Sequence, residues 1–199
     1  HPDGVHVFLG AVNGGVWRTK NIRALDAMGQ PSPVWEPLTD AFPSLAIGDV
    51  ALDPSTTATT PLNQTILWAG TGSFSSSGRF NEGGVGLLRS TDGGDSWIQQ
   101  QSNTNRNIID LFFLNENLGW AVAWSEGILP FVTFILKTTD GGINWTANQF
   151  RQENILMYSI YFLDSLKGFT GGNPGAIFNT TDGGANWDSA SIAPAPFAY

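Results

Sequence analysis

Three aspartates are the residues of this chain whose type and position could support catalysis. Asp49, Asp53 and Asp110 lie in or just after apolar segments that are expected to form strands. Glycoside hydrolysis needs two carboxyl groups flanking the scissile bond, so one of these side chains facing a central channel would be a weak catalytic candidate. Asp53 is followed by Pro54, which is typical of a turn. The favoured interpretation is therefore structural: all three are strand-end or turn acids.

A second set of residues could bind a ligand without transforming it. The segment 72–83 is rich in Gly and Ser and also contains Phe, Arg, Asn and Glu. Aromatic rings beside charged and amide side chains suit a sugar or a peptide, although a flexible insertion explains the composition equally well. With residues from the corresponding loops of the other repeats, the ligand-binding candidates are Asn13, Phe74, Arg79, Phe80, Glu82, Trp124, Glu126 and Asn173.

Metal and cofactor chemistry finds little support. The chain has no cysteine and only two histidines, His1 and His6, both near its start. Without thiolates there are no disulfides, cysteine nucleophiles or thiolate zinc sites. Acidic residues do not alternate as they do in an EF-hand loop. The sequence therefore predicts no metal site and no cofactor.

A repeated motif identifies the elements that must position these candidates. Ser/Thr-Thr-Asp-Gly-Gly-x-Ser/Asn-Trp occurs three times, ending at Trp97, Trp145 and Trp187. The copies are spaced by about 40 to 50 residues, the length of one four-stranded propeller blade. A degenerate fourth copy begins at Val16-Trp17-Arg18-Thr19 and reaches Trp35 after an insertion. Repetition at blade spacing favours a propeller.

The chemistry of the motif is that of a braced turn. Its glycines can adopt the positive φ of a tight hairpin, and its Asp and Ser or Thr side chains can accept backbone N–H groups across the turn. The Trp buries a large ring between neighbouring sheets. A structural role is therefore predicted for the motif residues Ser90, Asp92, Gly94, Trp97, Thr138, Asp140, Gly142, Trp145, Thr180, Asp182, Gly184 and Trp187.

Each motif copy is preceded by three short strand-like segments, and its Trp opens a fourth. We therefore expect an all-β protein made of antiparallel four-stranded propeller blades in a single region, residues 1–199. The blades are expected near 5–40, 45–103, 106–150 and 154–192, with 193–199 as a linker or an edge-covering strand. Blade one starts at its second strand. An arc of about four blades leaves open faces, so we expect further blades of the same chain, or further copies, to complete it.

These residues resemble the Asp-box (bacterial neuraminidase repeat) propeller superfamily. That superfamily includes sialidases, sortilin-type receptors, xyloglucanase-type glycoside hydrolases and photosystem II assembly factors. The first half, with 14–19 and 47–54, looks like the sortilin-type and xyloglucanase-type repeats. The second half, with 117–122 and 166–172, looks more like the photosystem assembly-factor repeats. The resemblance covers nearly the whole chain but implies a repeat, not one activity.

The resemblance leaves three functions open. The sialidase arginines and Tyr–Glu pair are not evident, and related repeats often carry an acid after Gly-Thr-Gly where this chain has Ser73. The first hypothesis is a non-enzymatic scaffold, secreted, at the cell surface or periplasmic, that binds protein or glycan through the loops between second and third strands. A fragment of a carbohydrate-active glycoside hydrolase is the second. A photosystem-type assembly factor is the third, and an arginine patch would favour it.

Charge limits the partners. The formal net charge of −8, from 17 acidic and 9 basic residues, repels phosphate backbones and anionic lipid headgroups. No apolar run approaches the length of a membrane span. We therefore expect neither nucleic acid binding nor membrane insertion.

Overall fold

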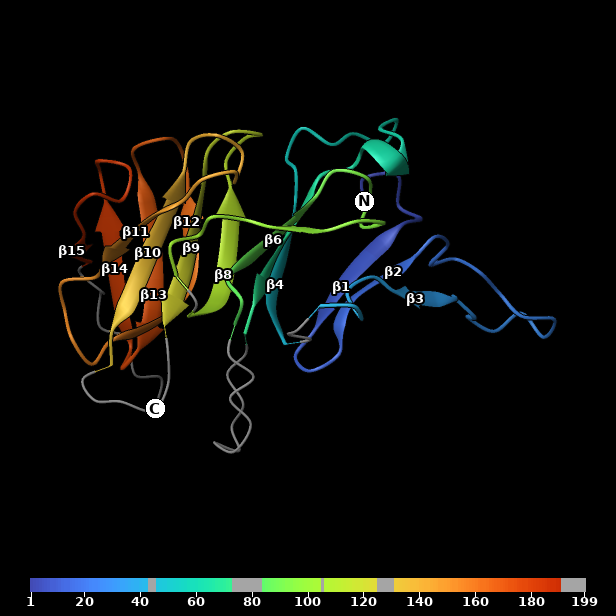
Figure 1. Ribbon diagram of the computed structural model, residues 1–199, viewed down its shortest axis with the longest axis horizontal. Coiled ribbons are helices and arrows are strands. Elements are labelled where there is room, and N and C mark those ends of the chain that lie inside the picture. The colour runs from blue at the N-terminus through green and yellow to red at the C-terminus, as the bar shows by residue number, and fades with distance from the viewer. Residues whose placement is uncertain (43–45, 73–83, 105, 125–130, 191–199) are drawn as a thin grey trace, which may run out of the picture.

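Four antiparallel sheets stand side by side in the computed structural model, which describes residues 1–42, 46–72, 84–104, 106–124 and 131–190 (Figure 1). In each sheet the strands follow one another in chain order, so each is a meander. This is the arrangement of propeller blades, and it confirms the all-β propeller fold. Within these residues no helix is long and apolar enough to cross a membrane.

Blade one has three strands and blades two, three and four have four each. The strands of blade one are β1 (Val7–Ala11), β2 (Gly15–Thr19) and β3 (Trp35–Pro37). Blade two consists of β4 (Ile47–Leu52), β5 (Leu67–Thr71), β6 (Leu87–Ser90) and β7 (Ile98–Gln99), with the 3₁₀ turn η1 (Leu62–Gln64). Blade three consists of β8 (Asn107–Phe113), β9 (Gly119–Trp124), β10 (Thr133–Thr138) and β11 (Thr146–Gln149). Blade four consists of β12 (Leu156–Phe162), β13 (Gly168–Asn173), β14 (Ala176–Thr180) and β15 (Asp188–Ser189).

The degenerate motif of blade one carries an insertion that projects from the arc. Between β2 and β3 the chain makes a long excursion, in blue at the right of Figure 1, closed by a bridge between Leu25 and Pro31. Asn21 still braces its start, because its side chain accepts the Arg23 amide at 3.1 Å. The insertion occupies the place where the other blades have a tight Asp-box turn.

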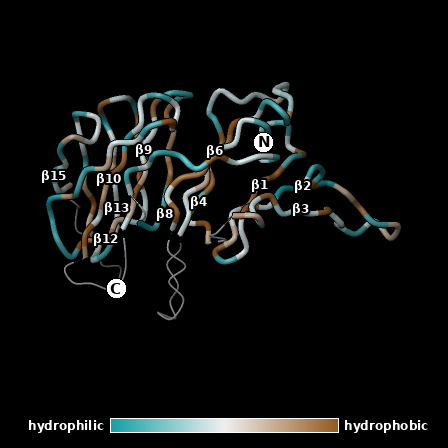
Figure 2. The backbone as a smooth tube through the Cα atoms, viewed as in Figure 1, coloured by the Kyte–Doolittle hydropathy of each residue, from teal (hydrophilic) through white to brown (hydrophobic). Residues whose placement is uncertain are grey.

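The cores lie between the blades. Hydrophobic residues follow the strands and hydrophilic ones the outer loops (Figure 2). At the interface of blades two and three, Trp68 stacks on Phe113 with ring centroids 3.7 Å apart. The next interface repeats this contact, with Trp120 on Phe162 at 3.5 Å. A flat ring in the second strand of one blade thus covers a ring at the end of the first strand of the next.

Polar side chains tie the same interfaces together. The indole N–H of Trp68 donates to the Gly141 carbonyl at 3.1 Å, and that of Trp120 donates to the Gly183 carbonyl at 3.0 Å. Two cationic side chains also donate to these turn carbonyls, and each comes just before the first Ser or Thr of its motif copy. Arg18 donates to the Gly93 carbonyl at 2.6 Å, and Lys137 donates to the Gly183 carbonyl at 2.9 Å. These bonds fix each Asp-box turn against the preceding blade.

Both ends of the arc expose apolar side chains within the described residues. On blade four, Tyr161 is 54% exposed, and Phe169 and Ile177 are each 42% exposed. On blade one, Leu9 of β1 is 53% exposed. Phe169 pairs with Tyr161 across the sheet, so these two exposed rings lie on the same face of blade four.

Candidate functional site

In blades two, three and four, the innermost strands β4, β8 and β12 each carry a bulge near their start. Each bulge changes the direction of one polar side chain. The register shifts between Ile47 and Asp49 in β4 and between Ile108 and Asp110 in β8. Such bulges add a residue to one strand and turn its side chain toward a new partner. The shared spacing, Ile-x-Asp, is a sequence signal that could have linked the two aspartates before the structure was known.

Asp49 and Asp110 form a ladder along the inner strands. Asp49 Oδ2 accepts the Leu111 amide of blade three at 3.0 Å, and Asp110 Oδ2 accepts the Ile160 amide of blade four at 2.6 Å. In blade four the corresponding bulge carries Ser159. Each carboxyl group therefore anchors the inner strand of the following blade.

The charge of Asp49 also acts on Asp110. Burial, followed by the charge of Asp49 and a hydrogen bond to it, raises the pKa of Asp110 to about 7, although the Ile160 N–H works in the opposite direction. Asp110 therefore holds its proton more strongly than an ordinary aspartate. Glycosidases need one free acid and one free base flanking the sugar. Asp49 and Asp110 instead each accept a backbone N–H of the next blade.

Asp53 lies at the opposite end of β4 from this pair. It is almost fully buried, and its carboxylate accepts the Ser55 amide at 2.8 Å. The side chain caps the turn that follows the strand, as the neighbouring Pro54 indicated. The structure therefore brings Asp49 and Asp110 together and leaves Asp53 apart.

Of the eight ligand-binding candidates, the structure describes three. Phe74, Arg79, Phe80, Glu82 and Glu126 lie outside the described residues. Asn13, in the turn between β1 and β2, and Asn173, at the end of β13, are exposed. Both occupy the ends of second strands, so they share the face predicted to bind a ligand.

Trp124 corrects one of these predictions. Its side chain is fully buried, and its indole N–H donates to the Met157 carbonyl at 2.9 Å. The ring lies edge-on to Tyr158, with centroids 5.9 Å apart. At this strand end the large ring turns toward blade four instead of solvent, so Trp124 supports the interface and offers no surface to a ligand.

The Asp boxes have one geometry in all three copies. In blade three, Asp140 accepts the Asn144 amide at 2.9 Å, and Thr138 Oγ1 accepts the Gly142 amide at 2.9 Å. Bonds from Asn186, first from its side chain and then from its amide, together with Thr180 lower the pKa of Asp182 to about 2. The carboxylates face their own turns, as braces do.

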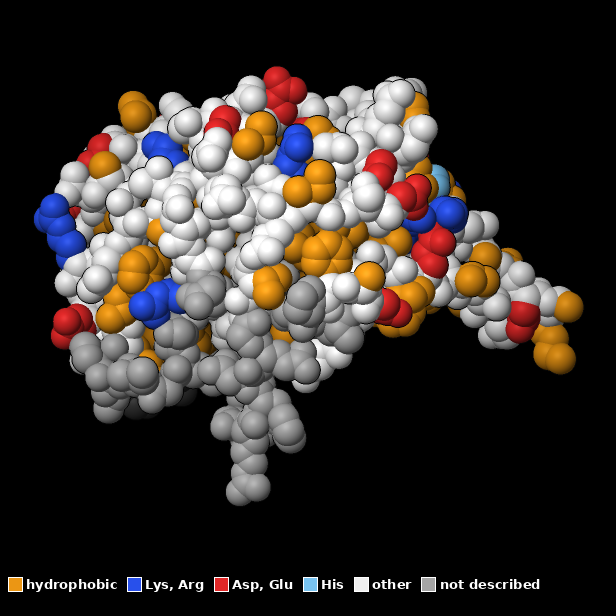
Figure 3. All heavy atoms as spheres, viewed as in Figure 1, with side chains coloured by type: hydrophobic (Ala, Val, Ile, Leu, Met, Phe, Trp, Pro, Cys, Tyr) orange, Lys and Arg blue, Asp and Glu red, His pale blue; other side chains and the backbone are white. Residues whose placement is uncertain are grey.

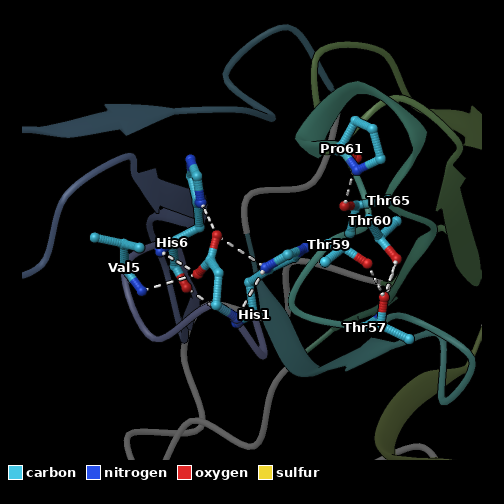
Figure 4. A network of polar contacts seen from close by, with 9 residues as sticks. His1, Val5, His6, Thr57, Thr59, Thr60, Pro61 and Thr65 are labelled. Atoms are coloured by element: carbon cyan, nitrogen blue, oxygen red, sulfur yellow. Dashed lines mark hydrogen bonds and ion pairs between the residues drawn. The ribbon is translucent and has the colours of Figure 1, made fainter.

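Near the chain start, three side chains that can bind metals lie together (Figure 4). His1 and His6 both contact Asp3 through Nδ1, the His1 contact at 3.0 Å. Asp3 also accepts the Val5 amide at 2.8 Å. Burial raises the pKa of Asp3, but these hydrogen bonds and the His6 ring outweigh it and hold the pKa at about 2. These bonds hold the three side chains together at the start of the chain.

The surface carries no dominant basic region on the face in Figure 3. Lys and Arg side chains there lie mostly apart, over different blades, with acidic side chains among them. A feature that sequence reasoning missed is a rim groove of about 280 Å³ between blades three and four. Its lining includes Gln149, Arg151, Asn186 and Trp187.

Similar solved structures are propellers. A GH74 xyloglucanase from Xanthomonas campestris matches with a TM-score of 0.67 and 15% identity over 94% of this chain and 28% of that one. An ancestral GH74 enzyme matches with a TM-score of 0.63 and 20% identity over 94% of this chain and 22% of that one. YCF48 from Cyanidioschyzon merolae matches with a TM-score of 0.54 and 14% identity over 93% of this chain and 55% of that one. At these identities the likeness shows the fold alone.

The chain therefore spans less than a third of either GH74 chain and about half of the YCF48 chain. No curated protein sequence matches it.

Sequence comparison defines the class. The family described as photosynthesis system II assembly factor YCF48 matches residues 95–195, which is half of the chain. The chain belongs to this family of Asp-box propellers. The match falls on the half whose repeats look most like those of the assembly factors.

Proposed function

We propose that this chain is a protein-binding scaffold of the assembly-factor type and not a hydrolase. Membership of the YCF48 family carries the proposal, because an assembly factor acts by holding other proteins. Among the three functions that the repeat leaves open, this membership moves the assembly factor ahead of the glycoside hydrolase fragment.

The inner-strand acids support a non-catalytic reading. Asp49 and Asp110 each accept a backbone N–H from the next blade, and Asp53 accepts one in its own turn. Carboxyl groups bound in this way are occupied by the fold. These three aspartates are therefore poor candidates for the free acid and the free base that hydrolysis needs.

The proposed contact surface is the face that carries the loops between second and third strands. Asn13 and Asn173 mark this face in blades one and four, and both side chains are exposed. Amide side chains donate and accept hydrogen bonds, which suits a protein surface or a glycan. A location outside the cytoplasm, as for a secreted, surface or periplasmic protein, is part of this proposal.

Affinity purification from cells of the source organism tests the proposal. We expect proteins, photosystem II subunits among them if the organism has that complex, to be recovered with the wild type. The double variant Asn13→Arg/Asn173→Arg should lose them, whereas Met28→Arg, on the projecting insertion, should keep them. Equal recovery with both variants, or saturable binding to a glycan array that the double variant abolishes, would overturn protein binding through this face. Fractionation of the same cells checks the location.

A further inference from the structure

The interface between blades two and three has an outer rim filled by the chain itself. After β7 the chain leaves its own sheet and runs beside the Asp box of blade three, where Gln101 forms a parallel bridge with Asn144. The Trp145 amide donates to the Gln101 carbonyl at 3.2 Å. The Asn103 side chain donates to the Trp145 carbonyl at 2.6 Å. The segment 101–103 thus satisfies both main-chain groups of Trp145, with Asn103 in a left-handed backbone conformation.

The chain takes a different course after blade three. Strand β11 extends over Thr146–Gln149, whereas β7 covers only Ile98–Gln99. The Phe150 amide then donates to the Thr133 carbonyl of its own blade at 2.8 Å, and the Phe150 ring packs edge-on against Phe178 with centroids 5.0 Å apart. Among the described residues after Phe150, none forms a bridge to the Asp box of blade four like that of Gln101 to Asn144, although the Arg151 side chain reaches Asn186.

The rim between blades three and four is consequently a groove of about 280 Å³. In the described part of the chain, no hydrogen bond joins the main chain of Trp187 to blade three, in contrast to Trp145. Trp187 is only partly buried, while Trp145 is buried. Arg151 Nη2 donates to Asn186 Oδ1 at 2.9 Å across the groove, so a cation and an amide lie beside the uncovered main chain.

We propose that this groove binds an extended segment of a partner protein, in the manner in which residues 101–103 fill the groove one blade earlier. The segment accepts the Trp187 amide with a carbonyl oxygen and donates a side-chain amide to the Trp187 carbonyl. This is strand addition to an Asp-box edge. The ligand class is an extended peptide with uncharged polar side chains of the Gln, Ser or Asn type.

The size and lining of the groove favour this occupant. Small-molecule pockets usually occupy about 300–1,000 Å³ and are mostly apolar. The groove is slightly smaller, and its lining mixes the amide side chains of Asn148, Gln149, Gln152 and Asn186 with the apolar Ile135, Phe150 and Trp187, with Arg151 as its cation. Such a lining suits a few residues of main chain. The inference rests on the proposed protein-binding function for the nature of the ligand, but it uses a different surface.

The chain supplies its own probe. A capped peptide with the sequence of residues 99–104, Gln-Gln-Gln-Ser-Asn-Thr, is titrated into the ¹⁵N-labelled protein. We expect saturable shifts of the Ala185, Asn186 and Trp187 amides and slower hydrogen exchange of the Trp187 amide by about tenfold at saturation. The Trp145 amide, already bonded, should not change. Replacing the Asn of the peptide with Leu should weaken binding about fivefold, the effect of one net hydrogen bond.

A matched pair of variants distinguishes binding in this groove from binding that any Asp box would give. Ala185 and Ile143 hold the same box position in blades four and three, and both are exposed. Ala185→Arg should fill the open groove and abolish the shifts, whereas Ile143→Arg should leave them unchanged. No saturable shift at millimolar peptide, or equal shifts in Ala185→Arg, would overturn the groove proposal. The proposed function fails separately, if the Asn13→Arg/Asn173→Arg variant retains its partners.

Discussion

Asp49 and Asp110 occupy equivalent bulges of adjacent inner strands, and each accepts a backbone N–H from the following blade. Burial and the nearby charge of Asp49 raise the pKa of Asp110 to about 7. The stability of the arc therefore depends on the protonation of Asp110.

The first prediction concerns pH. The pKa of Asp110 rises from its ordinary 3.8 to about 7 in the folded protein, so the folded state binds more protons than the unfolded chain between these values. Raising the pH through this window therefore removes stability. Asp110→Asn cannot ionise and keeps an oxygen for the Ile160 N–H. We expect it to be more stable than wild type by about 1–3 kcal/mol at pH 8, with this gain shrinking to nothing near pH 4.

Denaturant melts of both proteins from pH 4 to pH 8 measure the difference. The same Asp110 carboxyl can be followed by ¹³C NMR. A measured pKa below 5 in the wild type, or a stability difference that does not vary with pH, would contradict the raised pKa of Asp110. Asp49→Asn should lower the pKa of Asp110, because it removes the neighbouring negative charge.

The second prediction compares two indole donors. Trp68→Phe and Trp120→Phe each delete an N–H that serves a box glycine carbonyl. The Gly183 carbonyl keeps Lys137 as a donor at 2.9 Å. No such second bond to Gly141 exists among the described residues. We therefore expect Trp68→Phe to cost about 1–2 kcal/mol more than Trp120→Phe in urea melts, since it leaves a buried acceptor unpaired. Equal costs would show that the lysine does not compensate.

The third prediction concerns the Asp box. Asp140→Ala removes the acceptor of the Asn144 amide, of the Asn144 side chain and of the Thr138 hydroxyl. The thermal transition should fall by an amount equivalent to about 1–3 kcal/mol, with partner recovery unchanged. Ile143→Ala, in the same turn but exposed, should have little effect. Lost partner binding at unchanged stability would mean that the box contacts a ligand.

The fourth prediction concerns catalysis. We expect no release of reducing sugar from xyloglucan or sialosides, because Asp49 and Asp110 each accept a backbone N–H of the next blade and Asp53 is bound in a turn. A reducing-sugar assay with long incubation is sufficient. Hydrolysis that disappears in Asp49→Asn or Asp110→Asn would refute the scaffold interpretation.

The blades could be predicted from sequence because their signals are local. An Asp-Gly-Gly turn followed by Trp needs only a few neighbouring residues to explain it, and the boxes at Asp92, Asp140 and Asp182 recur at blade spacing. The residue types of the box also determine its hydrogen bonds. Each box forms its turn hydrogen bonds from its own residues, so they do not depend on how the blade packs against its neighbours.

The candidate site was harder to predict because it depends on how blades meet. The bulges that bring Asp49 and Asp110 together show only when adjacent strands are placed. Trp124 was predicted at a binding face, yet a Trp at a strand end gives the same sequence pattern whether its ring faces solvent or the next sheet. The groove beside Trp187 arises from β11 being longer than β7 (Thr146–Gln149 against Ile98–Gln99), a difference of pairing rather than of composition.

Most of the polar ties between blades also have a direction. Arg18, Asp49, Trp68, Asp110, Trp120 and Lys137 all lie in an earlier blade and bond to the main chain of a later one. A chain leaving the ribosome exposes its amino-terminal blade first. Each of these blades therefore finds side chains that hold it already in place, so the arc can grow in the order of synthesis without waiting for its far end.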